Sequence, residues 1–206
     1  MKLYYSLGAC SLVIRILIHE LNLKCEFEEV NLKTKLTKNG MDFFQINPKG
    51  FVPALELISG EILTENVVIQ QYLVDTNKAY NLLSPVKELS RYHILEWVTY
   101  INTELHKSFS PFFKPDIPAE IKEQIFKPIL FKNFNYVEKS LNKKDYLLGA
   151  NFTLPDIYLF VMIIWLKNKF PNDIEQWSNL NSFFDRLIKR EAFKKALNEE
   201  GLLGKF

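Results

Sequence analysis

Cysteine, histidine and glycine are all scarce in this chain of 206 residues. It contains two cysteines, three histidines and seven glycines. Two cysteines, Cys10 and Cys25, provide no disulfide framework, which is typical of proteins from a reducing compartment. The histidines are far apart, and the chain has no CxxC, HExxH, G-x-S-x-G or glycine-rich phosphate-binding motif. The sequence therefore predicts no metal site and gives no sign of a zinc protease, a P-loop enzyme or a serine hydrolase.

Long hydrophobic runs and a strong net charge are also missing. The apolar run that begins at Leu12 is broken by Arg15, so we expect neither a secretory signal nor a membrane span, which needs about 18 apolar residues. The net charge of +2 offers little attraction to nucleic acid or to a membrane surface. Basic residues near Lys189 and Lys194 are interpreted as a solvated helix face. These patterns predict a cytoplasmic protein with no nucleic-acid or membrane partner.

The most informative stretch that is present is NPKGFVPAL, residues 47–55. Its prolines and glycine exclude a helix, and Pro53 should hold Val52 extended with its N–H and C=O free to pair. Such an edge can bind a peptide-like ligand as one more strand. A short hairpin follows, and Thr64 or Glu65 then opens a helix over residues 67–75. Because the N–H groups at a helix N-terminus bind carboxylates, the sequence predicts an anion-binding site beside a backbone edge that can bind a peptide.

Apolar periodicity predicts an α/β domain at residues 1–76, a linker at 77–85 and an all-helical domain at 86–206. The first domain has the order β-α-β-α-β-β-α, with strands at 2–5 and 25–32, a helix at 12–21, an exposed loop at 33–40 and one helical turn at 42–45. In the second domain, Ser84 and Pro85 resemble a helix start, Ser110 and Pro111 a helix end. Further helices are expected at 117–141, bent at Pro128, and at 157–166, 180–190 and 191–199. Thr153 and Asp156 form a capping box before the apolar helix 157–166, which we expect at the centre of this domain.

The stretch NPKGFVPAL, followed by LTEN and a helix, resembles the thioredoxin-like half of cytosolic glutathione transferases. Cys10 and the pair His106-Lys107 make the chain most similar to the bacterial beta class. The resemblance implies the glutathione transferase fold, glutathione as co-substrate, a role in detoxification and a homodimer. It also implies that Pro53 is a cis-proline and that Val52 pairs with the cysteinyl backbone of glutathione.

The resemblance further assigns three residues to the two ends of glutathione. Glu65 and Asn66 would hold the γ-glutamyl end, although the superfamily commonly has serine where this chain has Asn66. Lys35 would reach the glycine carboxylate. From the residues alone, Glu65 and Asn66 also fit plain helix capping, and Lys35 fits a solvated loop.

The same resemblance implies that Cys10 and His106 are catalytic. Cys10 lies at the threshold of the first helix, which favours a thiolate, although a small buried residue is the alternative. Helical spacing places Thr99 and Thr103 on one face with His106, as a polar strip near the glutathione sulfur. Beta-class members often have asparagine where this chain has Thr99.

Three residues near the thiol receive lesser roles. Ser11 is a weaker candidate for a hydroxyl that contacts the thiol, and Tyr5 is expected in the core. Cys25, within the second predicted strand, is interpreted as core filler.

The sequence gives the least information about the pocket for the second substrate. The resemblance positions Phe112, Phe113 and Trp165 near its pocket, yet each could simply be core. The predicted reaction is attack of the glutathione thiolate on a small electrophile, or thiol–disulfide exchange through Cys10 with a disulfide substrate. The alternatives are a non-catalytic binding or stress-regulatory protein on the same fold, and a specialised glutathione-dependent isomerase or dehalogenase.

Overall fold

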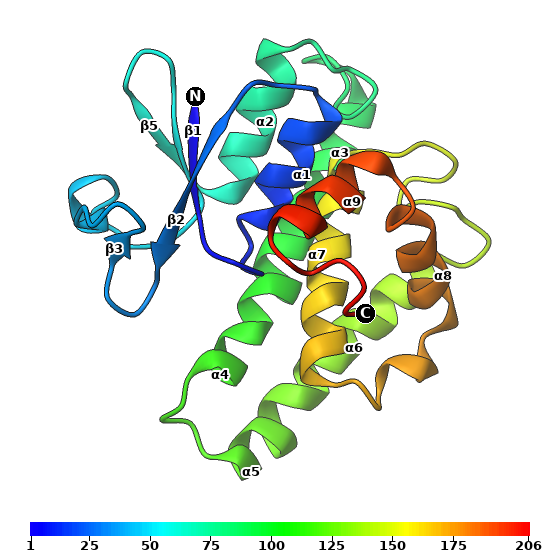
Figure 1. Ribbon diagram of the computed structural model, residues 1–206. Helices are drawn as coiled ribbons and strands as arrows, with labels where there is room; N and C mark the ends of the chain where they lie inside the picture. Colours follow the sequence, from blue (N-terminus) through cyan, green and yellow to red (C-terminus); the bar gives the residue numbers. More distant parts are fainter. The chain divides into compact units, whose positions relative to one another are not determined.

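The computed structural model describes all 206 residues, and they form two compact units (Figure 1). The first unit joins Met1–Ala79 to Lys189–Phe206, and the second spans Tyr80–Ile188. The last helix, α9 (Glu191–Glu199), therefore belongs with the first unit, whereas the sequence grouped it with the helical domain. It packs against α1 (Leu12–Glu20), and its apolar residues Phe193, Ala196 and Leu197 are buried.

The first unit contains a five-stranded sheet. Its strands are β1 (Lys2–Tyr5), β2 (Glu26–Asn31), β3 (Leu36–Thr37), β4 (Ala54–Glu56) and β5 (Ile62–Thr64). They lie in the order β3-β2-β1-β4-β5; β1 and β2 are parallel, and the other neighbours are antiparallel. The parallel pair is joined through α1, which confirms the predicted βαβ opening, and β4 and β5 form the predicted hairpin.

Both faces of this sheet are covered. Figure 1 shows α1 and α2 (Asn66–Thr76) on one side. A cluster of Tyr4, Val30, Phe43, Val52 and Ala54 fills the other side, with Phe43 supplied by the short 3-10 turn Phe43–Gln45. The side chain of Val52 is packed in this cluster, and its backbone lies at the edge of the cluster.

The prediction that residues 33–40 form an exposed loop is wrong for the centre of this stretch. Leu36 and Thr37 form β3, which pairs with β2 through Val30 and Asn31. Thr37 is buried, and its hydroxyl accepts a hydrogen bond from the backbone N–H of Met41. The alternating lysines and threonines concealed this strand because only two of its residues pair with the sheet.

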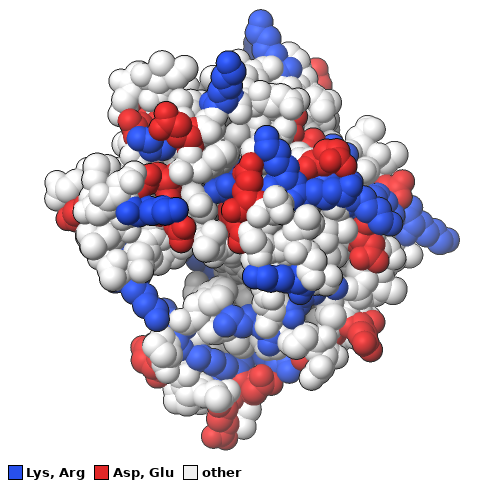
Figure 2. All heavy atoms as spheres, in the orientation of Figure 1, with Lys and Arg blue, Asp and Glu red and all other residues white.

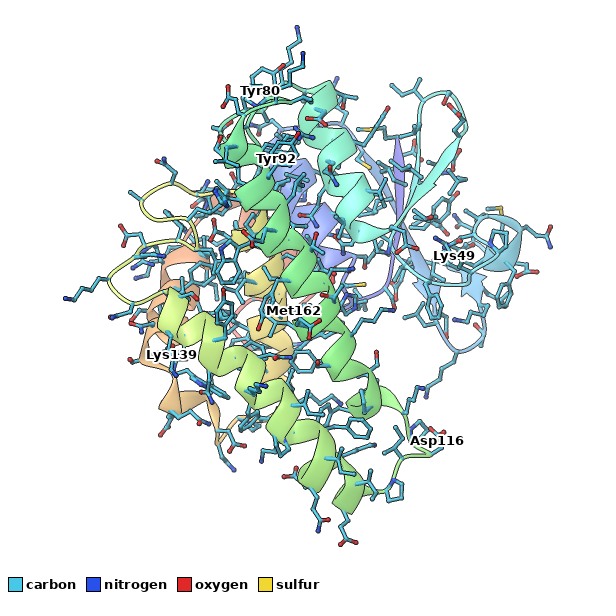
Figure 3. The ribbon with its side chains drawn as sticks, turned by 180° about the vertical axis from the view of Figure 1, so that it is seen from behind. Lys49, Tyr80, Tyr92, Asp116, Lys139 and Met162 are labelled. Carbon is cyan, nitrogen blue, oxygen red and sulfur yellow. The ribbon has the colours of Figure 1, made fainter.

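The second unit consists of helices around a buried central one. They are α3 (Leu89–Tyr100), α4 (Ser110–Phe113), α5 (Ala119–Ile121), α6 (Lys127–Ser140), α7 (Leu154–Lys169) and α8 (Ser178–Leu187). Nearly every residue of α7 is buried, including Met162, which Figure 3 labels, so the predicted central helix is confirmed. The capping box of Thr153 and Asp156 opens it, as expected.

Two predicted helix limits in this unit are wrong. Helix α3 begins at Leu89, because a turn at residues 86–87, closed by a bond from the N–H of Glu88 to the carbonyl of Pro85, separates it from Ser84. The helical path also does not stop at Pro111. It continues as a π-helical turn (Ile101–His106), a 3-10 turn (Lys107–Phe109) and α4. These turns change the hydrogen-bond register ahead of Pro111, so the missing N–H of proline interrupts no regular α-helical ladder.

Charge is distributed without a dominant sign. Figure 2 shows basic and acidic side chains interspersed with uncharged residues over the face that it draws. No helix is both long enough and apolar enough to cross a membrane.

Candidate functional site

The residues selected from the sequence fall into two groups, one in each unit. The first group surrounds Cys10, which lies two residues before the start of α1. Only 8% of Cys10 is exposed, and its thiol donates a hydrogen bond to the carbonyl of Val52, with 3.3 Å between Sγ and O. The thiol therefore contacts the very residue that was predicted to pair with a peptide ligand.

The other three candidates near the thiol, Ser11, Tyr5 and Cys25, are buried or bonded within the protein. The hydroxyl of Ser11 donates to the carbonyl of Ser6 at 3.3 Å and accepts from its N–H at 3.2 Å. Tyr5 is buried, as predicted, and burial raises the pKa of its phenol. Cys25 is not core filler, because it is only half-buried just before β2, where its thiol donates to the carbonyl of Glu26. Burial nevertheless raises the pKa of the Cys25 thiol, which makes it a poor nucleophile.

The Asn47 to Pro53 segment has the geometry that its resemblance implied. The Val52–Pro53 peptide bond is cis, and the N–H of Val52 bonds to no group of the chain. The Asn47 side chain donates to the carbonyl of Phe51 at 2.7 Å. Gly50 has a φ of +66°, and a Cβ there would lie 2.6 Å from the Phe44 ring, so a side chain at this position would strain the turn and displace that ring.

The side chain of Lys35 contacts this segment and is only partly exposed to solvent. Its ammonium donates to the carbonyl of Gly50 at 2.8 Å and lies 5.6 Å from the centre of the Phe51 ring. Its backbone has a φ of 59°, a left-handed conformation that residues other than glycine rarely adopt. The ammonium is thus held against the edge that ends in Val52.

Glu65 marks the start of α2 with an equally uncommon backbone. It has a φ of 71°, and its carboxylate makes no capping bond to the helix. The side chain is 64% exposed and pairs with the ammonium of Lys49, a residue labelled in Figure 3, which also donates to the hydroxyl of Thr64 at 2.7 Å. Helix capping, the alternative reading of Glu65, is therefore not what its carboxylate does.

Asn66 uses its side-chain amide within the protein. Its side chain is buried, donates to the carbonyl of Cys10 at 2.8 Å and accepts from Gln70 at 3.0 Å. The amide therefore fixes the backbone of Cys10 instead of projecting toward a ligand. The backbone N–H groups of Asn66 and Val67, in the first turn of α2, have no acceptor within the helix and remain suited to a carboxylate.

The second group surrounds His106, at the end of the π-helical turn. Nδ1 of its ring lies 2.7 Å from the hydroxyl of Tyr158, and that hydroxyl donates to Oδ1 of Asn102 at 2.9 Å. Burial and the nearby charge of Lys107 lower the pKa of His106 to about 4. The imidazole is therefore neutral at physiological pH.

The predicted strip of Thr99, Thr103 and His106 is wrong. Thr99 and Thr103 are exposed, and the hydroxyl of Thr103 bonds back to the carbonyl of Thr99. The π-helical turn has more residues per turn than an α-helix, so the residue that shares a face with His106 is Asn102, four positions earlier. An α-helix would make both Asn102 and Thr103 neighbours of His106, and the wider turn selects Asn102.

The aromatic residues predicted for the second substrate separate into two places. Trp165 lies edge-on to His106, with 5.1 Å between ring centres, and to Phe113, at 5.0 Å. The ammonium of Lys169 lies 4.9 Å above Phe113, which is 50% exposed. Phe112 instead packs on Phe170 at 5.1 Å. Trp165 and Phe113 thus form an aromatic wall beside His106, from which Phe112 is absent.

Sequence reasoning missed an ion cluster that supports the Cys10 segment. Arg15 pairs with Glu199 at 2.9 Å and with Glu200 at 3.1 Å, and Glu200 accepts a bond from the N–H of Gly8 at 2.7 Å. Burial raises the pKa of Glu200 to about 7. The signal was a charged residue inside the apolar run of α1. Lys49, Asn102 and Tyr158 were missed as well, because their partners lie elsewhere in the chain.

The first unit contains four groups that can bind a peptide-like ligand. They are the unpaired N–H of Val52, the start of α2, the carboxylate of Glu65 and the ammonium of Lys35. The second unit offers a neutral imidazole beside an aromatic wall. No group of three or more His, Cys, Asp or Glu is arranged to hold a metal ion.

Comparison with known proteins matches most of the chain, and the second family model extends beyond the second unit into α9. The family model "Glutathione S-transferase, N-terminal domain" matches residues 1–75, and "Glutathione S-transferase, C-terminal domain" matches residues 103–200. A glutathione S-transferase of Escherichia coli O157:H7 is 42% identical over 202 residues, which cover 98% of this chain and 100% of the relative.

Solved structures agree over nearly the full length. The structure of a sphingomonad glutathione S-transferase complexed with glutathione has a TM-score of 0.92 and 36% identity. A beta-class enzyme of Sphingomonas chungbukensis has a TM-score of 0.93 and 35% identity. In each case the match covers 98% of this chain and 100% of the other.

Proposed function

Because this chain belongs to the glutathione S-transferase family, we propose that it binds glutathione on its first unit and directs the glutathione thiolate at a small electrophile. In that reaction a carbon–sulfur bond forms, and the leaving group departs with its electron pair. The observation that carries the proposal is the unpaired N–H of Val52, in a segment whose Gly50 and Lys49 contact Lys35 and Glu65.

Each end of the tripeptide has a complementary group in this unit. The cysteinyl backbone would pair with Val52 as an added strand. The γ-glutamyl carboxylate would bind the free N–H groups of Asn66 and Val67 at the start of α2. The γ-glutamyl ammonium would replace Lys49 as the partner of Glu65, and the glycine carboxylate would bind the ammonium of Lys35.

Replacement of Glu65 tests this arrangement. Glu65→Ala should weaken glutathione binding by about 1.5–3 kcal/mol, the usual range for a hydrogen bond to a charged group. The melting temperature should change little, because the side chain is exposed. The control is Glu61→Ala, an exposed carboxylate on the β4–β5 hairpin that bonds only to Ser59. If titration calorimetry finds wild-type affinity in Glu65→Ala, the γ-glutamyl assignment is wrong.

We propose Cys10 and His106 as the residues that act on sulfur, and a second activity, thiol–disulfide exchange, depends on Cys10. Exchange requires a thiolate with access to a second sulfur. The bond from Cys10 to the carbonyl of Val52 must break first, since a thiolate has no proton to donate.

Oxidised glutathione should therefore add a single glutathione to the protein, on the peptide that contains Cys10. Cys25, with its raised thiol pKa, should remain unmodified. Intact mass and peptide mapping measure both. Cys10→Ala should abolish the adduct, and Cys25→Ala should leave it unchanged. An adduct on Cys25 would indicate that Cys10 is structural.

The second substrate, the assembly and the location are further parts of the proposal. Trp165 and Phe113 favour an aromatic electrophile. A panel of an aryl halide, an organic peroxide and a mixed disulfide would separate conjugation from peroxidase and exchange activity.

We also propose a cytoplasmic homodimer, on the basis of the resemblance to the family. Light scattering should then give twice the chain mass of 24.2 kDa.

A further inference from the structure

The turn that leads to Cys10 is bonded to the C-terminal end of the chain, within the first unit. Residues 6–9 form a tight turn, closed by a backbone hydrogen bond of 3.0 Å between its ends. That bond uses the N–H of the fourth residue, so the N–H of Gly8, in the third position, needs an acceptor elsewhere. It donates to Oε2 of Glu200 at 2.7 Å. Because Cys10 follows the turn directly, its thiol would move with the turn.

Glu200 is fixed by partners of its own. Its side chain is fully buried, and the guanidinium of Arg15, in α1, lies 3.1 Å from its Oε1. Arg15 is buried as well and lies over the rings of Tyr5 and Phe27, 4.0 Å and 4.1 Å from their centres. A carboxylate held in this way by α1 and the sheet is an acceptor at a fixed position, and the turn is bonded to it.

Cys10 is also held on its other side. Its carbonyl accepts a bond from the amide of Asn66 at 2.8 Å, and its thiol donates to the carbonyl of Val52 at 3.3 Å. The thiol is therefore placed between these two bonds and the turn that Glu200 holds. It is only 8% exposed, so a reagent in solution reaches it only when this local structure opens.

We propose that Glu200 is a positioning residue for Cys10: by accepting the N–H of Gly8 it fixes the turn ahead of α1 and keeps the thiol against the carbonyl of Val52. The inference rests on the proposed function for the identity of the sulfur with which Cys10 exchanges. The placement of the thiol itself does not depend on that function and can be measured without glutathione.

Two adjacent carboxylates allow a matched comparison. Glu199 and Glu200 both pair with Arg15, but only Glu200 bonds to the turn. The probe is iodoacetamide, applied to the full-length protein at pH 8, where Glu200 is ionised because its pKa is about 7. Peptide mapping gives separate alkylation rates for the two free cysteines, Cys10 and Cys25.

Glu200→Ala should raise the alkylation rate of Cys10 about tenfold, the effect of losing one hydrogen bond to a charged group. Glu199→Ala should leave that rate close to the wild-type value. The rate of Cys25, which lies outside the turn, should stay the same in both variants. An equal acceleration of Cys10 and Cys25 in Glu200→Ala would indicate a general loss of stability and would overturn the proposal.

A second pair of variants removes charge from the comparison and decides the question if Glu200→Ala does not fold. Arg15→Met/Glu200→Gln and Arg15→Met/Glu200→Leu both replace the buried ion pair by uncharged side chains of similar size, which is often neutral for stability. Glutamine keeps an acceptor oxygen for the N–H of Gly8, and leucine has none. Cys10 should therefore be alkylated about fivefold faster in the leucine variant. Equal rates overturn the proposal, because neither variant carries a charge that could act on the thiol directly.

Oxidised glutathione tests whether this placement matters for exchange. Exchange needs the attacking sulfur in line with the disulfide, whereas a small reagent can reach an exposed thiol from any open side. The rate of adduct formation on Cys10, divided by its alkylation rate, should therefore be about fivefold lower in the leucine variant than in the glutamine variant. An unchanged ratio overturns the positioning role. A wild type that forms no adduct overturns the proposed function instead, and the iodoacetamide rates still decide the role of Glu200.

Discussion

His106 illustrates how far burial alters one side chain. Its pKa falls from 6.5 to about 4, first because the buried site disfavours the charged ring and second because Lys107 lies nearby. The unfolded chain therefore binds more protons than the folded one between these values. The stability that results is complete above pH 6.5 and is lost as the pH falls toward 4.

This pKa predicts a measurable change in the free energy of unfolding. Between pH 7.5 and pH 5.0 the His106 contribution should fall by about 2 kcal/mol, and His106→Asn should remove that part of the pH dependence. Urea unfolding of both proteins at the two pH values measures the difference. His93→Asn, at an exposed histidine, should keep the wild-type slope. Equal slopes in the wild type and His106→Asn would contradict a buried neutral ring.

Asn66 shows why some residue roles could not be inferred from sequence. The motif located the residue correctly at the start of α2, but its side chain bonds to Cys10 and Gln70. Cys10 precedes it by 56 positions. A residue of this type can cap a helix, bind a ligand or fix a distant backbone, and only the folded environment selects among these.

At the scale of elements, the capping box of α7 is stronger than its motif suggests. The carboxylate of Asp156 accepts bonds from the N–H of Thr153 at 2.8 Å, from the hydroxyl of Thr153 at 3.1 Å and from the N–H of Leu147 at 2.9 Å. The first belongs to the box, whose other bond runs from the N–H of Asp156 to the side chain of Thr153, and the hydroxyl bond is additional to it. The third ties the preceding loop to the same carboxylate and was not predicted.

Asp156→Ala should accordingly lower the free energy of unfolding by about 2–4 kcal/mol, since it removes a cap and leaves the buried N–H of Leu147 unsatisfied. Urea unfolding gives the value, with Asp116→Ala, an exposed loop residue labelled in Figure 3, as the control. Glutathione affinity well below the melting temperature should be nearly unchanged. A loss of affinity without a loss of stability would place Asp156 in the binding site.

The π-helical turn is the element that sequence periodicity could not describe. The sequence predicted one helical stretch between Pro85 and Ser110, and its apolar residues Ile94, Ile101, Leu105 and Phe109 are all buried. The polar face of the same helix was misassigned, because the turn at Ile101–His106 rotates His106 away from Thr103 and into line with Asn102. Apolar residues tolerate such a rotation, whereas a hydrogen-bonding side chain depends on it.

At the scale of the whole molecule, the division into units assigns α9 to the first. Its residue Leu197 is fully buried, and Glu199 and Glu200 pair with Arg15 of α1. Leu197→Ala should cost about 2–5 kcal/mol in the first unit. Hydrogen exchange should then accelerate in α1 and α9. Leu187→Ala, at an equally buried position of α8, should instead accelerate exchange in α6 and α7 of the second unit. Acceleration of α7 without α1 in Leu197→Ala would refute the assignment.

The sequence alone determined most of the helices and strands, though not β3, together with the extended segment at residues 47–53 and the central capped helix, while the cis form of Pro53 was implied by the family resemblance. Those features depend on neighbours a few residues apart, through periodicity, proline geometry and capping. Only the tertiary structure decided that the Cys10 thiol bonds to Val52, that Glu200 holds Gly8 and that Tyr158 orients His106. These partners are separated by 42, 192 and 52 residues. Side chains so far apart leave no shared local pattern, because their pairing follows from how whole elements pack and not from the conformation of either segment.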